Sequence, residues 1–195
     1  MPVEFHRVEQ LNPRQLSILA KLSSYYSDDK VLTVLQPLIN QEGNISLRAL
    51  DWLVTNYAKK HNIVCLSQNN TLFNIHHGYK IALTYFRRRN FDPFRRRQRI
   101  QVICPGETTI QMVSTVGQCN FLQWADVNGV LLFARENSKA IEADMNTSTA
   151  NTKAEKRKSN ETGVILKRKE LSSAPSAKCL VYQIETNVSF GTLHD

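Results

Sequence analysis

The stretch from Phe86 to Arg99, FRRRNFDPFRRRQR, is rich in the residue type best suited to bind an anion. Seven of its fourteen residues are arginine. A guanidinium group stays charged at physiological pH and binds phosphate through two parallel hydrogen bonds. The only acid in the stretch is Asp92, so local ion pairs cannot neutralise it. We therefore expect a phosphate-binding surface made by Arg87, Arg88, Arg89, Arg95, Arg96, Arg97 and Arg99.

Positive charge is concentrated in two segments of the 195-residue chain, whose formal net charge is +8. Residues 87–99 carry +6 and residues 153–170 carry +4, so the rest of the chain sums to −2. Like charges in one short segment repel each other unless an anion offsets them. The expected partner is nucleic acid. An acidic protein partner and a plain solvated surface are the alternatives.

Two phenylalanines lie between the arginine triplets. Aromatic rings beside arginines can stack on nucleic-acid bases. They can also pack into the core and hold the turn in place. The structural role is favoured, so we expect Phe91 and Phe94 to shape the loop.

Patterns typical of catalysis are weak in this sequence. His76 and His77 are adjacent, so on a helix they point about 100° apart and make a poor pair of metal ligands. The sequence has no glycine-rich phosphate loop, nucleophile elbow or His-Glu-x-x-His motif. We expect a non-enzymatic protein with no cofactor and no metal. A nuclease made from scattered carboxylates is the minor alternative.

Cysteine spacing and hydropathy indicate the cellular setting. The four cysteines lack the spacing of a zinc knuckle and have apolar neighbours, so we expect buried free thiols. The N-terminus has no apolar signal core, and no run approaches the roughly 18 apolar residues of a membrane span. The expected setting is intracellular and reducing, not secreted. The cysteines are Cys65, Cys104, Cys119 and Cys179.

Helical and strand spacing predicts the elements that hold the arginine-rich stretch. One helix begins after Asn12, a second at Asp28 and a third at Ser46. Residues 63–75 form two short β-prone runs around a polar turn, which indicates a hairpin. The remaining predictions are a helix over 77–90 with Arg87–Arg89 in its last turn, a strand over 99–104, and helices over 116–129 and 130–146.

Three helices followed by a hairpin match the order of a winged-helix domain, in which the third helix enters a DNA groove. Here the third helix offers few polar groups that can read bases, namely Arg48, Thr55, Asn56 and Lys59. A helix that packs in the core is therefore favoured. Its predicted buried face is made by Leu47, Leu50, Leu53, Val54 and Tyr57.

The predicted fold class is α+β, with a mostly helical N-terminal half, a small mixed or antiparallel sheet and two later helices. We expect a globular domain over residues 1–146, a basic polar linker over 147–160 and a β-prone arm over 161–195. Two Lys-Arg-Lys triplets separated by eight residues resemble a bipartite nuclear-import signal. A solvated linker and added attraction for a polyanion are the other interpretations. The triplets are Lys156, Arg157, Lys158 and Lys167, Arg168, Lys169.

Four segments occur in order over about residues 45–146: ISLRALDWLVTNYAKKHNI, YFRRRNFDPFRRRQRI, TVGQCNFLQWADVNGVL and IEADMN. Together they resemble a family of uncharacterised proteins from nucleocytoplasmic large DNA viruses, the giant viruses. In that family a cysteine commonly follows the Phe-Asp-Pro-Phe block, where Arg95 stands here, and leucine is usual at the position of Cys119. These departures argue against a required thiol or metal at the two positions.

The resemblance implies a viral protein inside an infected host cell, in the cytoplasmic factory or the nucleus, and a place in the virion is compatible with it. Combined with the arginine-rich stretch, it favours a viral nucleic-acid-binding protein that contacts the phosphate backbone, and it implies DNA rather than RNA as the nucleic acid. The alternative is a virion structural or assembly protein. Its basic loop and C-terminal arm would then bind viral capsid or core proteins.

Overall fold

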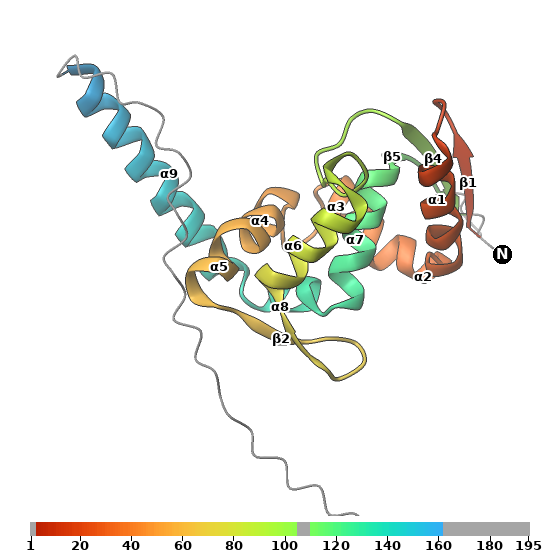
Figure 1. Ribbon diagram of the computed structural model, residues 1–195, viewed down its shortest axis with the longest axis horizontal. Helices are drawn as coiled ribbons and strands as arrows, with labels where there is room; N and C mark the ends of the chain where they lie inside the picture. The colour runs from red at the N-terminus through yellow and green to blue at the C-terminus, as the bar shows by residue number, and fades with distance from the viewer. Residues whose placement is uncertain (1–2, 105–109, 162–195) are drawn as a thin grey trace, which may run out of the picture. The chain divides into compact units, whose positions relative to one another are not determined.

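Helices predominate in the structure and two small antiparallel sheets accompany them (Figure 1), which confirms the predicted α+β class. The computed structural model describes residues 3–104 and 110–161, and residues 153–161 are described only as helix. The described chain up to Thr152 belongs to one compact unit. The β-prone arm predicted at the C-terminus lies, from residue 162 onward, outside the described residues.

The first helix, α1 (Pro13–Tyr25), begins where the sequence predicts. The Asn12 side chain accepts a hydrogen bond from the Gln15 backbone N–H at 2.9 Å, and the Gln15 side chain accepts one from the Asn12 N–H at 3.1 Å. This reciprocal capping satisfies two N–H groups that would otherwise lack partners at the helix start. Next follows a continuous helical segment of α2 (Asp28–Lys30), a π-helical turn η1 (Val31–Leu35) and α3 (Gln36–Ile39).

The third predicted helix is made of α4 (Leu47–Trp52), a π-helical turn η2 (Leu53–Tyr57) and α5 (Ala58–His61). The Ser46 hydroxyl caps it by accepting a hydrogen bond from the Ala49 N–H at 3.1 Å. Leu50, Leu53 and Val54 are fully buried, so this helix packs in the core as predicted. The hairpin of β2 (Val64–Leu66) and β3 (Leu72–Asn74) follows it, as the sequence indicates.

The larger sheet has three antiparallel strands in the order β1-β4-β5. The central strand, β4 (Arg99–Cys104), was predicted, and its alternate side chains Ile100, Val102 and Cys104 face the core. The edge strands β1 (Glu4–Arg7) and β5 (Ile110–Thr115) were not predicted. They pair with the two sides of β4. The sheet therefore fixes the C-terminal end of the arginine-rich stretch at Arg99.

Three helices complete the described chain: α7 (Val116–Val127), α8 (Val130–Glu136) and α9 (Ser138–Glu161). The single helix predicted over 130–146 is interrupted at Asn137, whose side chain donates a hydrogen bond to the Phe133 carbonyl at 2.9 Å. Within the described ranges, no helix is both long and apolar enough to cross a membrane.

The linker predicted over 147–160 is instead part of helix α9. Threonine is a weak helix former because its hydroxyl competes for backbone hydrogen bonds. Here the hydroxyls of Thr147, Thr149 and Thr152 each donate to the carbonyl four residues earlier, at 2.8–2.9 Å. Alanine, lysine, glutamate and arginine, which favour helices, follow in the sequence. Residues 147–160 are therefore helical, although their polar composition indicated an irregular linker.

Gly129 joins α7 to α8 in a conformation that disfavours any side chain. Its φ is +73°, and a Cβ atom at this position would lie 1.9 Å from the Leu66 carbonyl oxygen. We expect Gly129→Ala to lower the free energy of unfolding by about 1–3 kcal/mol or more. The alanine would strain the left-handed backbone conformation, and its Cβ would displace the hairpin that contains Leu66. Chemical denaturation measures the change.

Gly43→Ala is the matched control, because its Cβ would lie 3.4 Å from the nearest heavy atom. It should change the free energy of unfolding by less than about 1 kcal/mol. Equal denaturation midpoints for the two variants would contradict the expectation.

Candidate nucleic-acid interface

The arginine-rich stretch forms a loop, residues 87–98, that connects α6 (Ile75–Phe86) to β4; we call it the arginine loop. The prediction that Arg87–Arg89 end the helix is wrong. Helix α6 stops at Phe86, Arg87 takes a positive φ of 66°, and Arg88–Asn90 form a 3-10 turn. The Asn90 side chain donates to the Phe86 carbonyl at 3.1 Å and so replaces the next helical hydrogen bond. The first arginine triplet therefore leaves the helix.

The Phe91 side chain is buried in the core at the middle of the arginine loop. It is 1% exposed and its ring stacks on Phe86, with centroids 5.5 Å apart and an interplanar angle of 13°. It also makes edge-to-face contacts with Phe121 and Trp124, both on α7. The ring centroids of these two pairs are 5.3 Å and 5.4 Å apart. Such aromatic pairs add stability beyond the area they bury.

Phe94 behaves differently from Phe91, because its side chain is 48% exposed. Its backbone N–H donates to the Asp92 Oδ1 at 2.9 Å, so the turn is closed by the aspartate rather than by the phenylalanine ring. Arg95, Arg96 and Arg97 directly follow it in the sequence. Of the two predicted roles, Phe91 has the anchoring contacts and Phe94 has the exposed ring that stacking requires.

Helix α7 holds the backbone of the arginine loop through neutral side chains. Its N-terminal end lies beneath the loop (Figure 1). Three donors from the junction of β5 and α7 reach loop carbonyls, which secures the loop without using an arginine. The pairs are Asn120 Nδ2 to Asn90 at 2.8 Å, Gln118 Nε2 to Pro93 at 2.9 Å, and Thr115 Oγ1 to Arg95 at 3.3 Å.

Gly117 lets the arginine loop lie directly on the first turn of α7. A Cβ atom there would sit 3.3 Å from the Arg89 carbonyl oxygen and 3.3 Å from the Arg95 Cβ, closer than ordinary van der Waals contact. The Gly117 carbonyl also accepts from the Asp92 N–H at 3.4 Å. Both arginine triplets are therefore packed against one turn of one helix.

The second triplet ends at Gln98, which has a positive φ of 60°. The Gln98 N–H donates to a carboxylate oxygen of Glu9 at 2.6 Å, and its side-chain oxygen accepts from Arg95 Nη2 at 2.6 Å. The Arg99 Nε then donates to the Arg96 carbonyl at 3.3 Å as strand β4 begins. The loop is thus fixed at both ends and in its middle.

The guanidinium groups themselves are largely unpaired. Six of the seven arginines are exposed and Arg95 is half-buried. Among the residues that the structure describes, none of the seven has a carboxylate oxygen within 4.0 Å. Arg88 lies close enough to Asp51 to affect its pKa. Burial and the charge of Asp92 raise the pKa of Asp51, and the positive charge of Arg88 partly opposes that rise.

The two histidines form no metal site among the described residues, and the side chains of the two Lys-Arg-Lys triplets are not described. His76 Nδ1 lies 3.1 Å from the Val54 carbonyl, and His77 is exposed on α6. In the described ranges no group of three or more His, Cys, Asp or Glu side chains is arranged to hold a metal ion. Lys156, Arg157 and Lys158 fall in α9, where only the helix is described, and Lys167, Arg168 and Lys169 lie outside the described residues.

The described cysteines are free thiols, as predicted. Cys104 and Cys119 are buried, and Cys65 is half-buried. Burial raises the pKa of Cys119 to about 12, so this thiol stays protonated at neutral pH. A protonated, buried thiol is a packing residue.

The contrast between Phe91 and Phe94 predicts two different mutational outcomes. Phe91→Ala removes a ring that is buried among aromatic side chains, and we expect it to cost about 3–5 kcal/mol of unfolding free energy. Phe94→Ala removes an exposed ring and should cost about 0.5 kcal/mol or less. Thermal or chemical denaturation of both variants measures the difference. Similar losses for the two variants would refute the assignment of Phe91 as the anchor.

Comparison with known proteins places the chain in a family. Residues 4–182 match a family of unknown function, DUF7197. "Uncharacterized protein L507" of Acanthamoeba polyphaga mimivirus is 36% identical over 159 residues, which are 77% of this chain and 61% of the relative, so the chain spans less than two thirds of that protein. No solved structure matches. The resemblance to giant-virus proteins is confirmed, and the chain belongs to the family of unknown function DUF7197.

Proposed function

We propose that this protein binds nucleic acid by contacting the phosphate backbone with its arginine loop. One observation carries the proposal: the arginine loop together with Arg99, residues 87–99, has a net charge of +6 and presents six exposed arginines, none paired with a carboxylate in the described structure. Exposed cations without acidic partners favour a polyanionic ligand. Arginine suits phosphate because its planar group donates two parallel hydrogen bonds.

The rigid backbone of the arginine loop supports the proposal. The amides of Asn120 and Gln118 and the buried ring of Phe91 fix the loop before any ligand arrives. A preordered loop loses less conformational entropy on binding than a flexible one. The carbonyls of Asn90, Pro93 and Arg95 are held by neutral donors. Apart from Arg95, which donates to Gln98, and Arg99, which donates to the Arg96 carbonyl, the guanidinium groups keep their hydrogen-bonding capacity for phosphate oxygens.

The expected binding is largely independent of sequence. Phosphate contacts supply affinity and orientation but do not distinguish bases. The DNA genome implied by a giant-virus relative makes DNA the first ligand to test. The proposal assigns no reaction to the protein.

A role in virion assembly is the second candidate, and the β2–β3 hairpin favours it. Val64, Leu66 and Leu72 are 46%, 58% and 80% exposed, which gives the hairpin an apolar surface suited to a protein partner. Crosslinking in infected cells separates the two candidates. Crosslinks from the arginine loop to nucleic acid support our proposal, whereas crosslinks mainly to capsid or core proteins support assembly.

The proposal predicts how salt affects DNA binding. In a fluorescence-anisotropy titration of the full chain with duplex DNA, the logarithm of affinity should fall linearly with the logarithm of salt concentration. The double variant Arg96→Gln, Arg97→Gln should bind more weakly. Its salt slope should be shallower by about 0.9 for each phosphate that the variant no longer neutralises.

The matched control is Lys59→Gln, Lys139→Gln, which removes the same charge from exposed positions on α5 and α9. This control should keep a slope close to that of the unchanged protein. If the arginine variant retains both the affinity and the slope of the unchanged protein, the arginine loop is not the DNA-binding surface.

A further inference from the structure

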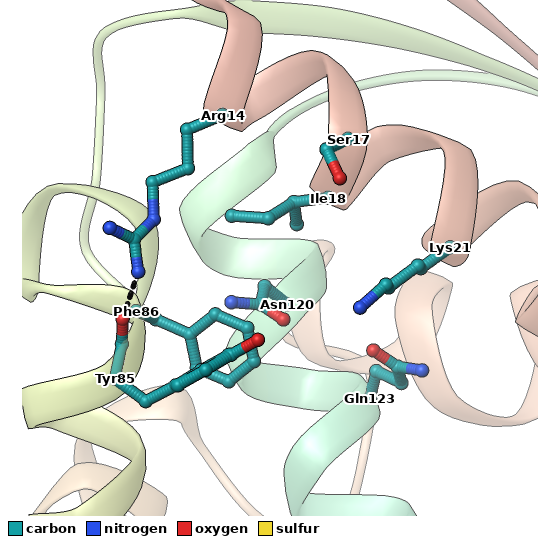
Figure 2. Close-up of a pocket in the computed structure, with 8 residues that line it drawn as sticks. All are labelled: Arg14, Ser17, Ile18, Lys21, Tyr85, Phe86, Asn120 and Gln123. Atoms are coloured by element: carbon teal, nitrogen blue, oxygen red, sulfur yellow. Dashed lines mark hydrogen bonds between the residues drawn. The ribbon is translucent and has the colours of Figure 1, made fainter.

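Next to the arginine loop, a cavity of about 240 Å³ opens between α1, the end of α6 and α7 (Figure 2). Its wall includes Tyr85 and Phe86, which directly precede the first arginine triplet. Asn90 of the loop contacts the cavity wall, because its carbonyl accepts a hydrogen bond from the lining residue Asn120 at 2.8 Å. Its side-chain oxygen accepts from Gln15 on α1 at 3.1 Å. A ligand on the loop therefore lies beside the cavity mouth.

Two cations give the cavity a positive charge. Arg14 and Lys21 lie seven residues apart on α1, so they project from the same face two turns apart. No aspartate or glutamate lines the cavity. The lining therefore favours an anionic ligand, as the arginine loop does.

An exposed aromatic ring lies beside these cations. Tyr85 is 61% exposed, and the Arg14 guanidinium lies 5.9 Å from the centre of its ring. Arg14 also donates a hydrogen bond to the Tyr85 backbone carbonyl, which fixes the Arg14 side chain at the end of α6 (Figure 2). Tyrosine rings and guanidinium planes are the groups on which unpaired bases stack.

A buried amide lies at the base of the cavity. Asn120 is only 2% exposed, and its Nδ2 is used by the Asn90 carbonyl. Its Oδ1 accepts no hydrogen bond from the described residues and lies on the cavity side (Figure 2). Gln123, one turn further along α7, adds a second amide to the wall. Side-chain amides pair with the hydrogen-bonding edges of bases.

We propose that this cavity receives one unpaired base of a nucleic-acid strand whose phosphates lie on the arginine loop. The cavity is smaller than the roughly 300–1,000 Å³ of pockets for whole drug-sized ligands, so it suits a single base. The base stacks against Tyr85, its edge meets Asn120 and Gln123, and Arg14 and Lys21 hold the flanking phosphates. This inference rests on the proposed function and adds a preference for single strands, because a paired base stays stacked in its duplex.

The test compares two single strands of equal length and charge: an oligothymidine and a strand with abasic linkers in place of bases. The phosphate contacts are the same in both, so their affinity ratio reports contacts to the bases, and variants of Tyr85 assign those contacts to the cavity. We expect the unchanged protein to bind oligothymidine at least about fivefold more tightly. Tyr85→Ala should bring the ratio near one, whereas Tyr85→Phe, which keeps the ring, should preserve it.

Two further variants keep the inference separate from the proposed function. Leu72→Ala removes an exposed side chain on the distant β2–β3 hairpin and should leave the ratio unchanged. Arg96→Gln, Arg97→Gln should weaken binding of both strands by a similar factor and keep the ratio. If the unchanged protein binds both strands equally in a salt-dependent manner, the cavity inference fails and the proposed function stands. If it binds neither strand nor duplex DNA, both fail.

Discussion

Burial of the Phe91 ring is the interaction on which the rest of the candidate interface depends. The ring lies between Phe86 at the end of α6 and the aromatic side chains of α7, so it joins two helices that are distant in sequence. Asn90 and Pro93 are buried beside the ring, whereas the arginines that precede and follow this buried segment are exposed or half-buried. This brings the two arginine triplets onto one turn of α7 and places Tyr85 at the mouth of the neighbouring cavity.

The arginine loop concentrates six like charges, and their mutual repulsion opposes folding. The structure shows how this repulsion is offset. The loop is held by apolar burial and by neutral amide and hydroxyl donors to its carbonyls. Neither kind of contact consumes a guanidinium group. A loop stabilised by ion pairs would have been equally ordered but would have given up its excess charge. The use of neutral donors thus links the stability of the loop to its capacity to bind an anion.

Local signals predicted the features that depend on nearby residues. Asn12 and Ser46 cap helices where the sequence indicates, and the alternation in Arg99–Cys104 gives the central strand.

The edge strand β1 was missed because three of its four side chains are exposed and show no clear alternation. The end of α6 was misplaced because it depends on the Asn90 cap and on aromatic partners about thirty residues later. The cavity could not be predicted, since Arg14 and Lys21 resemble ordinary surface charges until α1 packs beside α7.

In the proposed function, the arginine loop and the cavity contribute to recognition through different kinds of contact. Contacts to phosphate act on any strand and decline with salt, so they set affinity without choosing a ligand. A cavity that holds one base works through stacking, which every base supports, and requires that base to be unpaired. Asn90 connects the two, because its backbone belongs to the loop and its hydrogen bonds reach α1 and α7. A strand on the arginines and a base in the cavity would therefore stabilise the same packing contacts, so each would favour the other.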